Sequence, residues 1–144
     1  MITRVVNGIT IRPLRNGDTR AVQAVFDRLG PQSRLMRFGG AKPVLTERDL
    51  EVLARVDGDH HVLLALVDGE PIGIARLVRD GSEAEVAVEV VDEWQGRRVG
   101  TVLMEHLTSD ARAAGIERLH AYVVPENAVS RRLMRRSAVH VSFA

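Results

Sequence analysis

The chain has no cysteine among its 144 residues. This absence excludes a disulfide-stabilised scaffold, a catalytic thiol, and every zinc or iron site that is held by thiolates. The five histidines are scattered apart from the pair His60 and His61, so the sequence indicates no metal site. Aromatic residues make up only 3% of the chain, which argues against a base-stacking surface for single-stranded nucleic acid.

Long hydrophobic runs are also lacking. No apolar stretch approaches the roughly 20 residues that a membrane-spanning helix needs, and residues 1–6 lack the apolar core of a signal peptide. The sequence therefore predicts a soluble, cytoplasmic protein with no membrane partner. A length of 144 residues and a hydrophobic content of 45% predict one domain that covers residues 1–144.

Lysine is nearly missing, since Lys42 is the only one and 19 of the 20 basic residues are arginine. The 19 acidic residues bring the formal net charge to +1, so there is no general attraction for nucleic acid or membranes. The arginine excess has two explanations, codon bias in a GC-rich genome and phosphate binding by guanidinium groups. The positions of the arginines have to distinguish them.

The first part of the chain alternates between strand and helix patterns. Apolar and polar residues alternate over residues 9–14, which predicts a half-buried strand. Helical spacing follows over residues 18–29, with Asp18 as the cap, and a less regular helical region covers residues 34–38. Thr46 and Asp49 are typical of a capping box at the start of a third helix.

Three apolar runs occupy the middle of the chain, at residues 61–67, 72–78 and 84–91. Asp68-Gly69 and Asp80-Gly81 separate them, and both dipeptides favour tight hairpin turns. The three runs therefore predict an antiparallel meander.

The last third alternates between helix and strand. A loop over residues 95–101 leads into a helix that ends at Gly115, then a strand at 119–124, a helix at 126–136 and a short strand at 139–143. Antiparallel strands first and strand-helix-strand units afterwards predict an α/β fold. Its central sheet is partly antiparallel and partly parallel, and helices flank it.

The loop at residues 95–101 carries the clearest chemical signal. Gly96 and Gly100 allow close approach to the main chain, the following helix begins with unpaired N–H groups, and Arg97 and Arg98 add positive charge. These features predict an anion site. The loop lacks the lysine and hydroxyl of a phosphate-binding Walker loop, and it lacks GxGxxG, which disfavours nucleotide hydrolysis and dinucleotide binding.

The residues of this stretch point to one family. Residues 85–101, EVAVEVVDEWQGRRVGT, resemble the acetyl-CoA signature of the GNAT superfamily of N-acetyltransferases, Gln/Arg-x-x-Gly-x-Gly/Ala after the fourth strand. Residues 125–134 resemble its second conserved segment, in which Ala or Ser follows an Asn by three positions. Residues 11–15, 30–38 and 45–50 are similar to the acceptor side of bacterial protein lysine acetyltransferases of this superfamily.

The resemblance implies an acetyl-CoA-dependent N-acetyltransferase that uses no metal. In the family, the pantetheine arm pairs with the main chain of the fourth strand where the fifth strand diverges from it, and the pyrophosphate lies on N–H groups of the loop. The implied cofactor-binding residues are Val88, Val90, Gln95, Gly96, Arg97, Arg98, Val99, Gly100, Thr101, Asn127 and Ser130.

The amine that accepts the acetyl group must lose a proton, because a free lysine has a pKa of about 10.4. Glu85 matches the carboxylate that acts as general base in related protein acetyltransferases, and it is the implied catalytic residue. Glu89, four positions further along the same face of the strand, is the rival. For either residue, the alternative is a structural role as a solvated side chain or an arginine partner.

Three positions depart from the family pattern. Arg98 replaces the middle glycine, and we expect it to keep ordinary helical or extended angles. Met134 replaces the tyrosine that protonates the CoA thiolate in many members. Tyr122 and His120 are the candidates to supply this proton instead, and the alternative for both is a structural role at the sheet surface or in the core. Residues 137–139 replace the usual Gly-Phe, and the family sheet continues beyond this point. The predicted sheet is therefore short at its C-terminal strands, with an edge that a second copy of the chain could complete.

Two functions remain open from the sequence. The first is acetyl transfer to an amine, with a protein lysine favoured over a small molecule. The alternative is a catalytically weak acetyl-CoA-binding sensor or regulatory domain. Nucleic-acid binding through the arginines between residues 131 and 136 is weaker, because these side chains spread around one helix.

Overall fold

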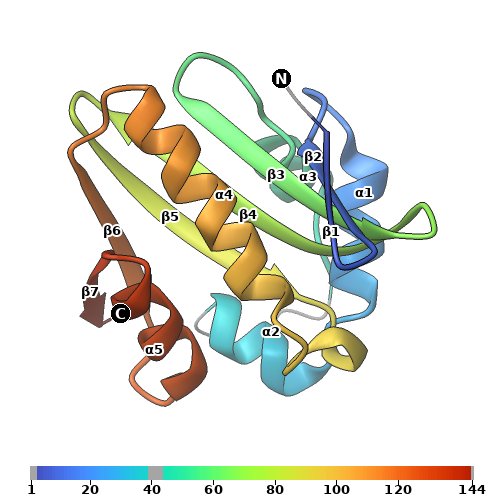
Figure 1. Cartoon of the computed structure of the whole chain (residues 1–144). Helices are drawn as coiled ribbons and strands as arrows, with labels where there is room; N and C mark the ends of the chain where they lie inside the picture. Colours follow the sequence, from blue (N-terminus) through green and yellow to red (C-terminus); the bar gives the residue numbers. More distant parts are fainter. Residues whose placement is uncertain (1–2, 39–43, 144) are drawn as a thin grey trace.

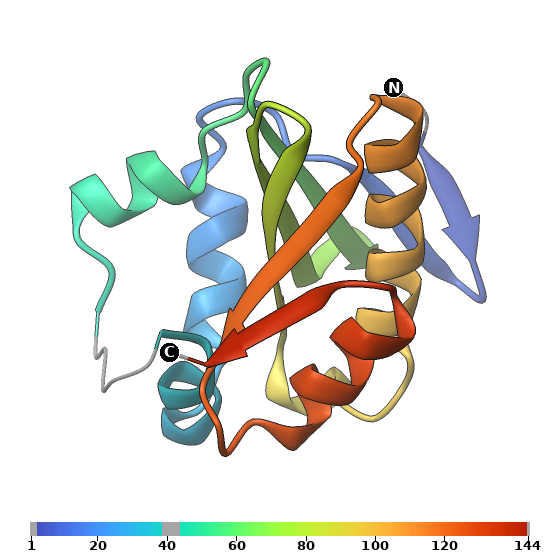
Figure 2. The same cartoon turned by 90° about the vertical axis from the view of Figure 1, so that its left-hand side faces the viewer.

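A seven-stranded mixed sheet forms the centre of the computed structural model, which describes residues 3–38 and 44–143 (Figure 1). Its strands are β1 (Arg4–Val6), β2 (Ile9–Pro13), β3 (His60–Val67), β4 (Glu70–Asp80), β5 (Glu83–Val90), β6 (Arg118–Val123) and β7 (His140–Phe143). The helices are α1 (Thr19–Asp27), α2 (Pro31–Phe38), α3 (Glu47–Leu53), α4 (Val99–Ala113) and α5 (Ala128–Arg136), and η1 (Asp92–Trp94) is a single 3-10 turn. Figure 2 shows the sheet between α4 on one side and α1 with α3 on the other.

The strands lie in chain order across the sheet, and their directions confirm the predicted mixture. The pairs from β1 to β5 are antiparallel, whereas β5 with β6 and β6 with β7 are parallel. The crossovers through α4 and α5 account for the change, because parallel neighbours need a long connection.

Local signals placed most of the elements correctly. The Asp18 side chain accepts a hydrogen bond from the Ala21 N–H at 3.2 Å, and both bonds of the Thr46–Asp49 capping box are formed. Asp68 and Gly69 both have positive φ, as the predicted β3–β4 hairpin requires.

Two local features differ from the prediction. The β4–β5 hairpin turns one residue later than expected, because Asp80 pairs with Glu83 and still belongs to the strand. Strand β1 was not predicted, since it has only three residues and is mostly exposed. It forms because a tight turn at Asn7 and Gly8, both with positive φ, folds it back onto β2.

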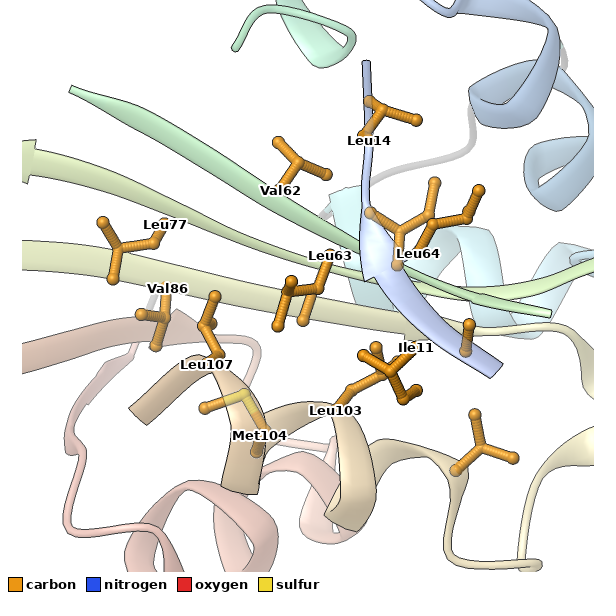
Figure 3. Close-up of a cluster of buried hydrophobic side chains, with 14 of the residues drawn as sticks. Ile11, Leu14, Val62, Leu63, Leu64, Leu77, Val86, Leu103, Met104 and Leu107 are labelled. Atoms are coloured by element: carbon orange, nitrogen blue, oxygen red, sulfur yellow. The ribbon is translucent and has the colours of Figure 1, made fainter. Parts of the chain in front are cut away.

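Helix α4 forms a large part of the core against one face of the sheet. Figure 3 shows Leu103, Met104 and Leu107 of α4 facing Leu63 and Val86 of the strands, and all five side chains are buried.

The close approach of α4 depends on Gly73 of β4. A Cβ atom there would lie 3.1 Å from Leu103 Cδ1, 3.2 Å from the Glu89 carbonyl oxygen and 3.3 Å from Val99 Cγ1. Packing at this position thus determines where the first turn of α4 lies relative to the end of β5.

Strands β5 and β6 separate soon after they meet. They pair only from Glu83 to Glu85, opposite Arg118 to His120, although β5 continues to Val90 and β6 to Val123 (Figure 1). Beyond Glu85, the β6-facing edge of β5 therefore has no neighbouring strand among residues 3–38 and 44–143.

Candidate active site

A cavity with a volume of about 610 Å³ lies where β5 and β6 diverge. Strand β5, the loop before α4, the end of β6, and helices α2 and α5 line it. Most of the predicted cofactor-binding residues meet there: Val88, Val90, Gln95, Gly96, Arg98, Val99, Gly100, Thr101, Asn127 and Ser130. Arg97 is not part of the lining.

The main chain of β5 presents hydrogen-bonding groups to this cavity. Val91 donates its N–H to the Ile72 carbonyl at 2.9 Å, so the odd-numbered residues of this strand bond to β4. Because the pattern alternates, Val88 and Val90 direct their N–H and C=O groups toward the gap. The Val90 carbonyl already accepts a bond from Gln95 Nε2 at 2.9 Å, which leaves its N–H and both groups of Val88 for a ligand.

The first turn of α4 contributes further donors. The first helical hydrogen bond runs from the Val102 N–H to the Arg98 carbonyl at 3.0 Å, so the N–H groups of Val99, Gly100 and Thr101 have no partner within the helix. Arg98, at the N-cap, makes no capping hydrogen bond with its side chain. The helix therefore offers the lining of the cavity a set of donors at its positive end.

The expectation for the backbone of Arg98 is wrong. Arg98 has φ 67° and ψ 12°, which is the left-handed conformation and not a helical or extended one. Gly96, two residues earlier, also has positive φ at 74°. Together they turn the chain from η1 into α4, and the conformation costs about 1 to 2 kcal/mol at a residue with a Cβ.

Gln95 and Arg97 have roles that the sequence did not reveal. Gln95 Nε2 donates to the Ser33 hydroxyl at 3.0 Å as well as to Val90, so it connects α2 with the end of β5. The Arg97 guanidinium lies over the Trp94 ring, 4.8 Å from its centroid. Both side chains stabilise the shape of the loop.

Asp92 completes this connection, and sequence reasoning missed it. Its carboxylate accepts the Ser33 hydroxyl at 2.6 Å and the Gly30 N–H at 3.1 Å. Gly30 is held close enough that an added Cβ would lie 2.5 Å from Asp92 Oδ2. The start of α2 is therefore joined to the loop that precedes α4.

Asn127 and Ser130 lie together at the start of α5. The Asn127 side-chain oxygen accepts the Ser130 N–H at 3.1 Å and caps the helix. The amide nitrogen of Asn127 and the hydroxyl of Ser130 are the groups that remain to face the cavity.

A second cavity, of about 300 Å³, adjoins the first and contains Glu85 in its lining. The two cavities share Met36, Arg37, Val86, Ala87 and Tyr122. Glu85 is exposed, and within the described residues its side chain makes no hydrogen bond or ion pair. It is therefore an available carboxylate beside the junction.

Glu89, the rival carboxylate, is in a different environment. It is buried and forms ion pairs with Arg76 Nη1 at 3.3 Å and Arg37 Nε at 3.4 Å. Burial, together with the nearby Arg37, lowers the pKa of Arg76 to about 10, while Glu89 opposes the shift. The Arg76 Nη2 group also donates to the Leu53 carbonyl at 3.3 Å. Glu89 thus serves as the counterion of two guanidinium groups.

Three residues were considered as the proton source for the leaving thiol, and they differ in their position relative to the two cavities. Met134 is buried, with 2% exposure, in the lining of the first cavity. Tyr122 is 61% exposed and lines both cavities, and the His120 ring lies 4.6 Å from its ring. Of these three side chains, only the hydroxyl of Tyr122 belongs to the junction.

The cavity combines main-chain groups of β5 with N–H groups at the start of α4 that have no partner within the helix. Main-chain groups of β5 match an amide-containing arm, and the N–H groups of α4 match a phosphate group. Comparison with known proteins agrees, because the model of the acetyltransferase (GNAT) family matches residues 23–138. The chain belongs to the GNAT acetyltransferase family.

Two curated relatives are similar over most of the chain. Acetyltransferase Pat of Mycolicibacterium smegmatis is 32% identical over 132 residues, and acetyltransferase PA5475 of Pseudomonas aeruginosa is 32% identical over 120 residues. These alignments cover 88% and 78% of this chain but 39% and 64% of the relatives. The chain therefore spans less than two thirds of the length of each of these relatives.

A solved structure supports the same assignment. The GNAT domain of PAT from S. lividans has a TM-score of 0.85 and 29% identity, and the match covers 95% of this chain and 84% of that one. Among the helices of residues 3–38 and 44–143, none combines the length and hydrophobicity needed to cross a bilayer. In the same residues, no group of three or more His, Asp or Glu side chains forms a candidate metal site.

Proposed function

We propose that this GNAT domain transfers the acetyl group of acetyl-CoA directly to a primary amine. The observation that carries the proposal is the junction of two cavities at Val86, Ala87 and Tyr122. One cavity has the main-chain donors that suit the CoA ester, and the other has the free carboxylate of Glu85. A donor and an acceptor that enter from opposite sides would meet at this junction.

The residues of the first cavity bind and orient the donor. Bound acetyl-CoA would supply the acetyl group as a thioester. The Val88 and Val90 main chain holds the amide-containing arm, the N–H groups of Val99, Gly100 and Thr101 bind the pyrophosphate, and Arg98 adds charge. Asn127 and Ser130 contact the arm from the α5 side.

Glu85 prepares the acceptor. The acceptor enters as an ammonium and releases one proton to Glu85, directly or through water. The free amine nitrogen then forms a bond to the acetyl carbon, the carbon–sulfur bond breaks, and CoA leaves as a thiolate. The second proton that the nitrogen loses on becoming an amide passes to the sulfur. A thiol has a pKa near 8.5, so this leaving group tolerates the replacement of the usual tyrosine by Met134. Tyr122 is the residue that we assign to returning a proton to sulfur.

Two classes of primary amine are candidates for the acceptor. Sequence similarity alone, over residues 30–38 and 45–50, favours a protein lysine, and a small-molecule amine is the other acceptor; the lining of the second cavity bears on the choice between them. Both present a primary amine to Glu85, so the chemistry is the same for both.

The test measures the amine-dependent release of CoA from acetyl-CoA with a panel of amines, in the wild type and in Glu85→Gln. We expect kcat to fall by about 10²- to 10⁴-fold in the variant, with the KM for acetyl-CoA unchanged, because only proton transfer is lost. Glu83→Gln is the matched control, since Glu83 lies on the same strand, is exposed and contributes to neither cavity.

Two outcomes of these measurements would contradict the proposal. A thermal shift with acetyl-CoA but no acetyl transfer to any amine would contradict the proposal and favour the sensor role. Equal activity in Glu85→Gln and Glu83→Gln would remove Glu85 as the base. Intact-mass measurement of the acceptors separates transfer from simple hydrolysis of the donor.

A further inference from the structure

We infer that the second cavity binds a carboxylate next to the reacting amine, and that the preferred acceptor is therefore a free α-amino acid. The inference rests on the proposed function and specifies its substrate class. Its basis is a cluster of two guanidinium groups and one carboxylate, those of Arg37, Arg76 and Glu89, which is here called the arginine cluster. Both arginines line the second cavity.

The arginine cluster carries one uncompensated positive charge. Arg76 and Arg37 share Glu89, at 3.3 and 3.4 Å, and both arginines are cationic at neutral pH. The Arg76 side chain is 10% exposed and that of Glu89 is 7% exposed. The Arg37 side chain is 21% exposed and lines the second cavity, and a partly desolvated guanidinium group without a counterion of its own favours an additional anion.

Hydrogen bonding leads to the same conclusion. The Nε atom of Arg76 is buried and finds no hydrogen-bond partner in the described part of the chain, whereas the Nε atom of Arg37 already lies 3.4 Å from the Glu89 carboxylate. Guanidinium groups bind carboxylates through paired N–H donors, which makes a carboxylate the matching ligand. The unused donor and the excess charge belong to the same cluster.

The position of Arg76 indicates which substrate brings the anion. Arg76 lines the second cavity and not the first, whereas Arg37 lines both. The proposed donor occupies the first cavity. An anion that reaches Arg76 therefore arrives with the acceptor.

The register of the sheet places this charge beside Glu85. Arg76 is opposite Ala87, and Glu85 is opposite Val78, so Arg76 and Glu85 are diagonal neighbours on one face of β4 and β5. Diagonal positions are about 7–8 Å apart, within reach of long side chains. An α-amino acid, whose ammonium and carboxylate share one carbon, fits this pair of opposite charges. The ε-amine of an internal lysine has no carboxylate beside it.

The size of the second cavity agrees with a small acceptor. At about 300 Å³ it is at the lower end of small-molecule sites. Met36, Phe38, Val78 and Val124 contribute apolar side chains to its lining, which would accommodate an apolar amino-acid side chain.

The first experiment uses the unmodified protein with saturating acetyl-CoA. Each amino acid is compared with its own carboxamide and with a blocked peptide that contains one internal lysine. We expect kcat/KM to be about ten- to a hundredfold higher for the acid than for the amide, because one charge-assisted contact is lost. Mass spectrometry should locate the product at the α-nitrogen.

The outcomes separate this inference from the function on which it rests. Equal rates for acid and amide, or a preference for the lysine peptide, would overturn the inference and leave the acetyltransferase function intact. No transfer to any acceptor would contradict the proposed function itself.

A second arm tests the other source of a carboxylate, the acyl group. With amide acceptors, succinyl-CoA is compared with butyryl-CoA, which has the same chain length and no charge. We expect no preference for succinyl-CoA. A tenfold or larger preference would assign the carboxylate to the donor and overturn the acceptor assignment.

A variant connects the selectivity to the arginine cluster. Arg37→Gln should reduce the acid-to-amide ratio toward one, and Arg37→Lys should restore part of the ratio. Arg118→Gln is the control, because it removes the same charge from an exposed position outside both cavities. An unchanged ratio in Arg37→Gln would refute the role of the cluster. If that variant does not fold, the acid and amide comparison in the wild type still decides.

Discussion

Arg98 gives the sharpest quantitative prediction, because its backbone conformation is unfavourable for any residue with a Cβ. Its φ of 67° lies in the left-handed region, at the N-cap of α4. The perturbation is a pair of substitutions, Arg98→Ala and Arg98→Gly. Both remove the guanidinium group, so their difference isolates the backbone.

The magnitude follows from two opposing effects. The left-handed conformation costs about 1 to 2 kcal/mol with a Cβ present, and glycine avoids that cost. Glycine also has more freedom in the unfolded chain, which costs about 0.5 to 1 kcal/mol. The Arg98→Gly variant should therefore be more stable than Arg98→Ala. We expect its free energy of unfolding to be higher by about 0.5 to 1 kcal/mol and its Tm to be higher by about 1 to 4 °C.

Urea denaturation followed by circular dichroism measures this difference, with thermal unfolding as a second readout. The neighbouring pair Arg97→Ala and Arg97→Gly is the control, because Arg97 is not among the described residues with positive φ. There the glycine variant should be the less stable one. If Arg98→Gly is no more stable than Arg98→Ala, the left-handed conformation is not a source of strain and the reasoning fails.

Three further substitutions test the packing and charge of the same region. Ala138 has φ 59° at the end of α5, so Ala138→Gly should raise the free energy of unfolding by about 0.5 to 1 kcal/mol in urea titrations. Gly73→Ala should lower it by about 1 to 3 kcal/mol, because the Cβ would meet Leu103 and the Glu89 main chain; an unaffected midpoint would contradict this. Glu89→Gln should lower it by about 3 kcal/mol, since two guanidinium groups lose their counterion. A stable Glu89→Gln variant with lost activity would instead favour Glu89 as the base.

Much of the fold was predictable because the signals are local. Turn residues such as Asp68 and Gly69 specify a hairpin, and the Thr46 capping box specifies the start of α3. The β4–β5 turn was misplaced by one residue because Asp80, although common in turns, can also pair as the last residue of a strand. Strand β1 escaped prediction because three residues carry too little periodicity.

The site was predictable in part. The loop motif at residues 95–101 identified the lining of the first cavity, since main-chain groups at a helix N-terminus depend on local sequence. It did not reveal that Gln95 connects α2 with β5, because Ser33 lies 62 positions away. The left-handed angle of Arg98 was also missed, because the loop must close between the end of β5 and the packed start of α4.

The sequence by itself determined the order of the elements, the family signature and the candidate carboxylates Glu85 and Glu89. Only the tertiary structure decided which carboxylate is available. The register of β4 against β5 brings Arg76 onto the face of Glu89, and α2 adds Arg37 from a distant part of the chain. Hydrophobic spacing determines which face of an element is buried, but the charges that meet on that face depend on packing between elements.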